Sequence, residues 1–258
     1  MKIVVLLKEV PDTYGDRKLD LETGLADRGA SDAVVDEIGE RALEVALAYA
    51  DKTDDTEVSI LTMAPEGATA SIRKGLGMGA GSAVHVIDSG LIGADLGQTA
   101  EVLAAALRQE SFDLVLAGNE STDGATGMLP VMLAELLQVP NLTNLSEVRI
   151  EADKISGTRA SDDCAIEVTS SLPAVVSITE ALPDARFPNF KGIMAAKKKP
   201  LETKSLNDLG IDPTDMTPAR SIMLEVAERP ARAAGVKVTD DGTAAAQLAT
   251  FLADNQLV

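Results

Sequence analysis

Cysteine and histidine are nearly missing from this 258-residue chain, which has one of each, Cys164 and His85. These two residues cannot build an intrachain disulfide framework, and they lack the spacing of a zinc site. Cys164 follows two aspartates, whose carboxylates disfavour a reactive thiolate. His85 stands inside an apolar run with no carboxylate beside it, so we expect a structural role for it. We expect no metal site and a reducing compartment.

Long apolar runs and an excess of basic residues are missing as well. No stretch of about 18 apolar residues occurs, so the sequence predicts no membrane span. The apolar run at residues 3–7 is too short for a signal-peptide core, and we expect a cytoplasmic protein. Lys and Arg number 23 against 41 Asp and Glu, which gives a formal net charge of −18. Nucleic acid is therefore not expected as a partner, and the acidity favours solubility or steering toward a basic partner.

Apolar segments of two kinds alternate over the first 140 residues. Short runs rich in Val, Ile and Leu, typical of buried parallel strands, occur at residues 2–8, 57–64, 83–88 and 113–118. Segments with helical spacing lie at residues 31–52, 67–80, 95–109 and 127–138. We expect Asp32 to cap the first of these helices and Asp95 to lie at the start of the third. The alternation predicts an α/β fold, an open and mostly parallel sheet with helices on both faces.

The pattern changes after Pro140. Residues 146–179 are typical of short strands joined by turns, and we expect an antiparallel addition to the sheet. Residues 180–200 show little periodicity and predict an exposed loop that ends in a basic cluster. From residue 201 the chain is polar until a last helix at residues 243–254, whose apolar side chains need a partner. We expect a domain of residues 1–200, with residues 183–199 exposed for docking, and a C-terminal linker and helix of residues 201–258, forming an extended arm.

The glycine-rich stretch AGNESTDGATGMLP covers residues 117–130, where a predicted strand meets a predicted helix. Ligands of open parallel sheets bind outside the carboxyl ends of the strands. Glycines let the backbone approach a phosphate, and the amides of a following helix can donate to it. Asp123 could bind a ribose hydroxyl or cap the helix. Taken alone, the stretch fits an ordinary loop and a phosphate cradle equally well.

The usual catalytic patterns are missing too. The chain has no Walker lysine, no G-x-S-x-G elbow and no zinc spacing. We therefore expect a binding or carrier subunit that performs no acid–base catalysis of its own.

Several collinear motifs resemble one family, the β subunit of electron transfer flavoprotein. They are VVLLKEVPDT at residues 4–13, VVDEIGERALEVAL at 34–47, SIRKGLGMGA at 71–80, LPAVVSIT at 172–179, RFPNFKGIMAAKKKP at 186–200 and AGVKV at 234–238. The resemblance runs nearly from end to end, and its lysine-rich motif is specific.

The resemblance implies an adenine nucleotide α-hydrolase-like fold and a heterodimer with an α subunit. Such proteins accept electrons from acyl-CoA dehydrogenase and other flavin dehydrogenases, as in fatty acid oxidation. They pass the electrons toward a membrane quinone reductase. One FAD is held mainly by the α subunit, with its flavin ring at the β interface. The β subunit of many members also binds AMP.

The resemblance also assigns site residues in this chain. The positions expected to face AMP are Leu6, Ala33, Val34, Val35, Asp36, Met63, Gly118, Asn119, Ser121, Thr122, Asp123, Gly124, Ala125, Thr126, Gly127, Met128 and Leu129. Asp12, Thr13 and Tyr14 fall near the FAD. Phe190 falls at the apolar anchor for a dehydrogenase, accompanied by Arg186, Phe187, Lys191, Ile193 and Met194.

Two alternatives stay open. Asp123, Gly124 and Thr126 match the electron-bifurcating form of the family, in which a second FAD replaces AMP and accepts a hydride from NADH. The chain could also be an adenine-nucleotide-binding stress-type protein that works alone. The lysine-rich loop and the unburied last helix speak against that alternative, because both are typical of partner-binding segments.

Overall fold

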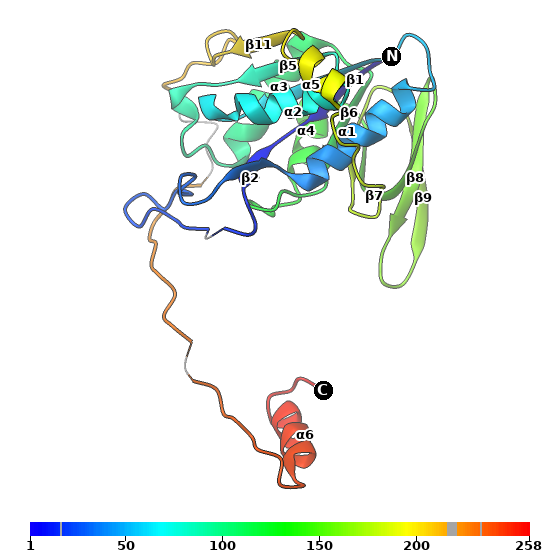
Figure 1. The fold of residues 1–258 in the computed structure, drawn as a ribbon. Coiled ribbons are helices and arrows are strands. Elements are labelled where there is room, and N and C mark those ends of the chain that lie inside the picture. Colours follow the sequence, from blue (N-terminus) through cyan, green and yellow to red (C-terminus); the bar gives the residue numbers. More distant parts are fainter. Residues whose placement is uncertain (16, 216–220, 233) are drawn as a thin grey trace. The chain divides into compact units, whose positions relative to one another are not determined.

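The computed structural model describes residues 1–15, 17–215, 221–232 and 234–258 (Figure 1). The chain divides into two units, Met1–Glu225 and Val226–Val258. The first unit contains a nine-stranded sheet with the order β11-β5-β4-β1-β6-β10-β7-β8-β9. The strands are β1 (Lys2–Leu6), β4 (Glu57–Met63), β5 (Ser82–Val86), β6 (Leu114–Gly118), β7 (Asn141–Ile150), β8 (Lys154–Ala160), β9 (Ala165–Ser171), β10 (Ala174–Ile178) and β11 (Leu201–Lys204).

The sheet is parallel from β11 to β7, and β8 and β9 extend it in antiparallel register. A separate pair, β2 (Glu9–Pro11) and β3 (Ala33–Val35), is antiparallel. The predicted α/β fold with a mostly parallel sheet and an antiparallel addition is confirmed.

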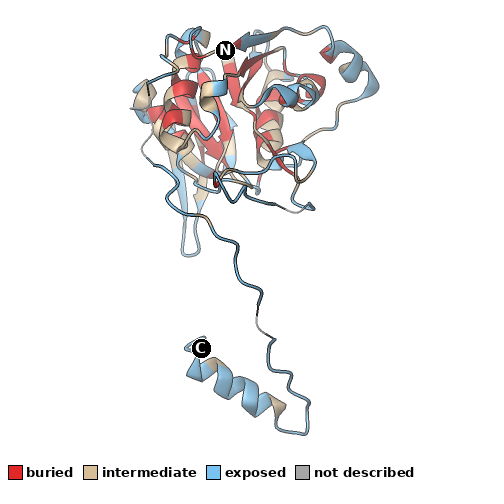
Figure 2. Cartoon of the chain, turned by 90° about the vertical axis from the view of Figure 1, so that its left-hand side faces the viewer, coloured by how far each residue is buried: buried red, intermediate tan, exposed pale blue. Residues whose placement is uncertain are grey.

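Helices cover both faces of the sheet because the central strands are apolar on both sides. On β1, Ile3 and Val5 belong to one buried cluster and Val4 to the other. The first cluster includes residues of α1 (Glu37–Ala50), α2 (Thr69–Met78) and α5 (Phe190–Ala196), and the second includes residues of α3 (Leu96–Glu110) and α4 (Leu129–Leu137). Figure 2 shows the buried residues gathered in the strands and on the inner sides of these helices. Two short 3₁₀ helices, Glu66–Ala68 and Ser89–Leu91, precede α2 and α3.

The start of the first helix was predicted wrongly. Residues 33–35 are extended and pair with β2, so α1 begins at Glu37 and its N-cap is Asp36, not Asp32. The Asp36 N–H donates to the Lys8 carbonyl, which continues this pairing and delays the helix. In contrast, Asp95 lies at the start of α3 as expected; it is the N-cap, and its side chain accepts the Gln98 N–H.

Two more segments differ from the expectation. β10 is a parallel strand between β6 and β7, not part of an antiparallel addition, and all five of its residues are buried. A strand buried on both faces is typical of the interior of a parallel sheet, and its turn-rich neighbours hid this signal. Residues 190–196 form the helix α5 within the predicted loop, and Asn189 caps it by accepting the Gly192 N–H.

Residues after 200 begin with a strand of the sheet, because β11 pairs with β5. The first unit continues to Glu225, and the second contains α6 (Ala244–Asp254). More than half of the surface of Leu248 and Phe251 on α6 is exposed. The division at residue 200 into a nucleotide-binding domain and a partner-binding arm stays a prediction. None of the helices in the described part of the chain has the length and apolarity needed to cross a bilayer.

Candidate functional site

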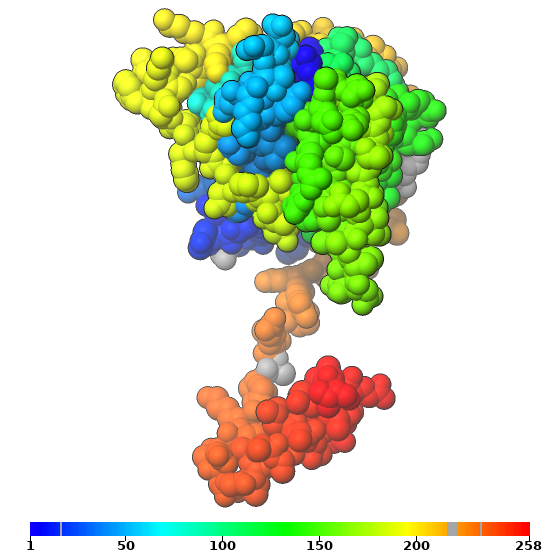
Figure 3. Space-filling model, turned by 90° about the vertical axis from the view of Figure 1, so that its right-hand side faces the viewer, coloured from blue at the N-terminus to red at the C-terminus, as the bar shows by residue number. Residues whose placement is uncertain are grey.

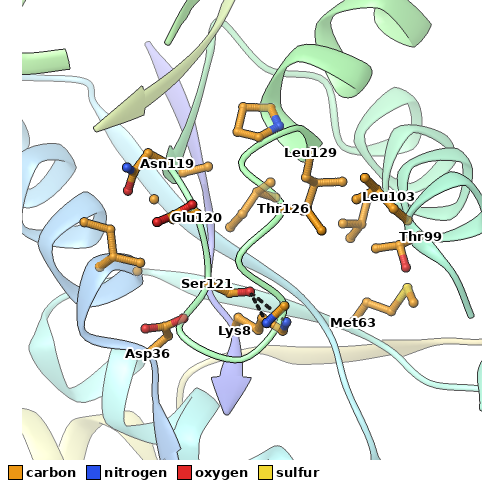
Figure 4. Close-up of a pocket in the computed structure, with 18 of the residues that line it drawn as sticks. Lys8, Asp36, Met63, Thr99, Leu103, Asn119, Glu120, Ser121, Thr126 and Leu129 are labelled. Carbon is orange, nitrogen blue, oxygen red and sulfur yellow. Dashed lines mark hydrogen bonds between the residues drawn. The ribbon is translucent and has the colours of Figure 1, made fainter. Parts of the chain in front are cut away.

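The strand order of the sheet reverses between β1 and β6. From β1 the chain moves outward to β4 and β5, and α3 then carries it back to β6 on the other side of β1. Such a reversal opens a crevice outside the carboxyl ends of the two strands, where ligands of doubly wound sheets bind. A cavity of about 290 Å³ lies there (Figure 4). The sheet topology therefore places a ligand-sized cavity where the glycine-rich stretch was expected to act.

The lining of this cavity agrees with part of the predicted nucleotide site. Predicted residues that line it are Leu6, Asp36, Met63, Gly118, Asn119, Ser121, Gly124, Thr126, Gly127 and Leu129. The remaining predicted positions do not line it: Ala33, Val34, Val35, Thr122, Asp123, Ala125 and Met128. Of these, Val34, Val35 and Thr122 line a neighbouring cavity. The strand at residues 33–35 explains part of the difference, because it turns this segment toward β2.

Sequence reasoning did not assign the start of α3 to the site. The residues 94–96, Thr99 and Leu103 come from this part of the chain and line the cavity, as does Lys8, which follows β1. A signal for the start of α3 was present, since Asp95 follows β5 at the same edge of the sheet. Recognising that α3 leads back across the sheet would have placed its first turns at the cavity.

Gly118 ends β6 where the backbone passes close to α1. A Cβ at this position would lie 2.5 Å from Ile38 Cγ2, so a side chain does not fit without a shift. Beyond it, the Ala125 N–H donates to the Ser121 carbonyl and Gly127 adopts a φ of +63°, a region that favours glycine. The glycines thus allow a tight loop whose backbone lies against the cavity.

The carboxylate of Asp123 pairs with groups of the protein and does not line the cavity. Its Oδ1 lies 2.5 Å from Lys8 Nζ, which also donates to Ser121 Oγ at 3.1 Å, and Arg28 Nη2 lies 3.9 Å from its Oδ2. Burial raises the pKa of Asp123, but the hydrogen bond and charge of Lys8 outweigh this and lower it. Asp123 does not cap α4, because the N-cap of α4 is Met128. It instead accepts the Gly124 N–H of its own loop.

Asp36 is the most unusual group in the cavity wall. It is 2% exposed, and its Oδ2 accepts the Thr122 N–H at 3.0 Å. Its Oδ1 is buried and has no hydrogen-bond partner among the described residues. Burial raises the pKa of Asp36; the hydrogen bond from Thr122 opposes this and the charge of Asp123 adds to it. Buried polar atoms are nearly always paired, so the free oxygen calls for a donor.

A second cavity of about 430 Å³ shares Asp36 as a wall with the first. Its lining includes Thr13 and Val35 as well as Arg186 and Phe187. The segment expected near FAD thus borders the segment expected to dock a dehydrogenase. Tyr14, next to Thr13, is 99% exposed, and its N–H donates to Asp12 Oδ1 at 2.9 Å.

Comparison with known proteins identifies the family. The model of the electron transfer flavoprotein domain matches residues 23–209. The chain is 46% identical over 263 residues to the electron transfer flavoprotein subunit beta of Mycobacterium tuberculosis, with 99% of each chain covered. It belongs to the β-subunit family of electron transfer flavoproteins.

More distant members are similar over most of the chain. The electron transfer flavoprotein subunit beta of Bacillus subtilis is 32% identical over 84% of each chain. A subunit named CarD of the caffeyl-CoA reductase-Etf complex of Acetobacterium woodii is 33% identical, over 83% of this chain and 81% of its own. Membership of this flavoprotein family implies a flavin and an α-subunit partner.

The docking residues expected from the electron transfer flavoprotein resemblance lie on or just before α5. Phe187 and Phe190 are 90% and 80% exposed, and Ile193 and Met194 are about half exposed. Lys191 is exposed as well. The side chain of Arg186, in contrast, pairs with Glu44 of α1 and with Asp51, the C-cap of that helix.

Three other residues singled out in the sequence have structural partners. His85 is buried, with Nε2 2.9 Å from the Ala64 carbonyl oxygen. Cys164 is exposed in the β8–β9 turn, with Sγ 3.4 Å from Ser161 Oγ. Lys199, in the basic cluster, donates to the carbonyls at the end of α2, and burial lowers its pKa.

Proposed function

We propose that this chain is the β subunit of a heterodimeric electron carrier. It accepts electrons from acyl-CoA dehydrogenase and other flavin dehydrogenases through an FAD shared with the α subunit. The electrons then pass toward a membrane quinone reductase. AMP occupies the cavity between β1 and β6 as a structural ligand. The observation that carries the proposal is this cavity at the strand reversal, in a chain similar to electron transfer flavoprotein β subunits over 99% of its length.

The groups around the cavity suit an adenine nucleotide. The free Oδ1 of Asp36 would accept a hydrogen bond from an amino or ribose hydroxyl group. A phosphate would be held by Lys8 and by the amide end of α4, whose first turn lines the cavity at Leu129 and Pro130. Apolar side chains, among them Leu6 and Leu103, would contact the base.

The FAD contributes the redox chemistry when it is bound. This chain would supply the surface formed by Asp12, Thr13, Tyr14 and Val35, with the α subunit holding the rest. The exposed ring of Tyr14 and the cavity beside Thr13 support this, because both leave a surface that a flavin could cover. The chain's own residues would orient the flavin and exclude water from it.

A second FAD in the AMP cavity, with NADH oxidation, is the alternative favoured by the match of Asp123, Gly124 and Thr126 to the bifurcating form. Two observations count against it. The cavity of about 290 Å³ is small among ligand pockets, and FAD adds a phosphate, a ribityl chain and a flavin ring to AMP. Asp123 is occupied by Lys8 and turned toward its own loop.

A stress-type protein that works alone is the third possibility. The exposed apolar residues Phe187, Phe190, Leu248 and Phe251 argue for a chain with partners. The full-length similarity to electron transfer flavoprotein β subunits argues the same.

The released nucleotides separate the three functions. The chain is co-expressed with its α subunit, purified and denatured, and the nucleotides are identified and counted by chromatography. One FAD and one AMP per heterodimer is the expected result. Two FAD per heterodimer would replace the proposal by the bifurcating function. AMP or ATP on a stable single chain without flavin would refute both.

A further inference from the structure

We propose that Arg186 and Arg41 are positioning residues that fasten the docking segment, residues 183–199, to helix α1. This inference rests on the proposed function, in which that segment contacts a dehydrogenase. It gives Arg186 a role different from direct contact with the partner. The two arginines would fix the segment in its docking conformation before the partner arrives.

The first fastening is a chelate between Arg186 and α1. Its Nε and Nη2 lie 2.7 and 2.8 Å from the two carboxylate oxygens of Glu44. The Arg186 backbone N–H donates to Glu44 as well, at 3.0 Å, and Nη1 lies 2.9 Å from Asp51 Oδ2. Burial raises the pKa of Glu44, but the bonds from Arg186 outweigh this and lower it. Bidentate pairs of this kind fix orientation as well as distance.

The second fastening runs in the opposite direction, from α1 to the segment. Arg41 donates to the Leu182 carbonyl at 2.5 Å and pairs with Asp184 at 2.5 Å. Its side chain is 14% exposed, and Glu37 on the same helix holds it at 3.0 Å. Arg41 on α1 and Arg186 on the segment therefore connect α1 to the five residues 182–186 from opposite sides of the contact.

The far side of the segment is fixed on α2. A Cβ on Gly192 would lie 2.3 Å from the Gly77 carbonyl oxygen, so the backbones of α5 and α2 touch. Arg73 of α2 donates to the Ala196 carbonyl at 2.6 Å and to the Lys199 carbonyl at 2.8 Å. Figure 3 shows the docking segment, in yellow, beside α1, in blue.

Between the contacts with α1 and those with α2, the apolar side chains of the docking segment are exposed to solvent. Phe187 and Phe190 are 90% and 80% exposed although their backbone is held. Residues 183–189 have no regular secondary structure, and ordering such residues on binding costs backbone entropy. A segment that is ordered beforehand avoids this cost at the moment of docking. Fastening thus lets a few apolar side chains support a specific but brief contact.

The test is a double-mutant cycle on the co-expressed heterodimer, with Arg186→Ala, Glu44→Gln and both together. The electron donor is a purified acyl-CoA dehydrogenase reduced with octanoyl-CoA. We expect KM for the dehydrogenase to rise about tenfold in each single variant and no further in the double variant, because both changes break one pair. We expect kcat to stay within about twofold, since the flavin is untouched.

Three further measurements separate positioning from general damage. Arg186→Lys keeps the positive charge but cannot form the bidentate pair, so its KM should lie between those of the natural protein and Arg186→Ala. Amide hydrogen exchange in residues 183–190 should accelerate in Arg186→Ala while the flavin potential is unchanged. Arg149→Ala removes an exposed arginine–glutamate pair, in which Arg149 Nη2 lies 3.5 Å from Glu147 Oε2 and both side chains are 64% exposed, and should leave KM unchanged.

The outcomes distinguish this inference from the proposed function. An unchanged KM in Glu44→Gln, together with a raised KM in Arg186→Ala, would mean that Arg186 contacts the partner directly and would overturn the fastening. If Phe190→Ala leaves KM unchanged, the docking segment itself is refuted. If Phe190→Ala raises KM while Arg186→Ala and Glu44→Gln both leave KM unchanged, the fastening alone is refuted.

Discussion

Replacing Asp36 by Asn should stabilise the empty protein and weaken nucleotide binding, two effects of opposite sign. Asp36 is 2% exposed, and one of its oxygens has no partner among the described residues. Its raised pKa, caused first by burial, means that the folded protein disfavours the charge. An Asn can still accept the Thr122 N–H, which Asp36 now accepts at 3.0 Å, and it carries no charge.

The size of the stabilisation follows from the charge on the unpaired oxygen. Asn leaves an unpaired polar group at the same place, but a buried neutral group costs less than a buried charge, by at least about 1 kcal/mol. Removing the charge should therefore raise Tm by about 2–4 °C in a unit of this size. A hydrogen bond to a charged group contributes about 1.5–3 kcal/mol, so losing it should weaken AMP binding about 10- to 150-fold.

The stabilisation should depend on pH with a definite sign. Below the unfolded pKa, about 3.9, Asp36 is protonated in both states and the variant gains nothing. Above the raised folded pKa the whole cost of the buried charge is present in the native protein. The advantage of Asp36→Asn should therefore be complete near pH 7 and shrink as the pH falls toward about 4.

Thermal unfolding of the nucleotide-free heterodimer between pH 4 and pH 8 and titration calorimetry with AMP measure the two effects. Asp95→Asn is the matched control in the same cavity wall, because both of its oxygens are engaged, with the Gln98 and Ser221 amides. It should lower Tm at neutral pH. A lowered Tm in Asp36→Asn, or an AMP affinity within about threefold of the natural protein, would refute the reasoning.

Three other predictions concern the loop and the last helix. Gly118→Ala would place a Cβ 2.5 Å from a side-chain carbon of α1 and should destabilise the protein by about 1–3 kcal/mol in denaturant unfolding, whereas Gly67→Ala, where no atom lies within 4 Å, should be tolerated. Lys8→Met should remove the stability that the pair of Lys8 with Asp123 contributes. Because the folded protein lowers the pKa of Asp123, this stability is present above about pH 4 and is lost as the pH falls through the lowered pKa. Equal acid-unfolding curves for the variant and the natural protein would contradict this. Phe251→Asp should leave the circular dichroism of the chain unchanged but weaken its binding to the α subunit, which surface plasmon resonance can measure; undiminished binding would exclude α6 from that interface.

The fold was predictable where the hydrophobic period was clear. The four apolar runs before residue 120 form β1, β4, β5 and β6. They could be recognised because a strand that is buried on both faces is a continuous apolar run without alternating polar residues. The start of α1 was placed four residues too early, since residues 33–35 satisfy helical spacing as well as a short strand. Only the return of the chain to pair with β2 decides between the two, and that contact is not local in sequence.

The candidate site was predictable in outline but not in its electrostatics. The rule that ligands bind at the carboxyl ends of parallel strands pointed to the loop after β6. That Lys8 neutralises Asp123 while Asp36 keeps an unpaired oxygen depends on the close approach of three segments that are distant in sequence. No spacing rule contains this information. The same holds for Arg186, whose partners, Glu44 of α1 and the C-cap Asp51, lie more than 130 positions away.

Helix α1 connects the two proposed sites. Its N-cap, Asp36, lines the cavity between β1 and β6, and Glu44, eight residues later, binds Arg186 of residues 183–199. At 1.5 Å per residue these two positions are about 12 Å apart along the helix. The residues Ala42, Leu43, Ala46 and Leu47 on the inner side of α1 are at most 4% exposed, so the sheet fixes the helix between the two sites. Under the proposed function, one helix fixed in this way would hold both the bound nucleotide and the docking segment.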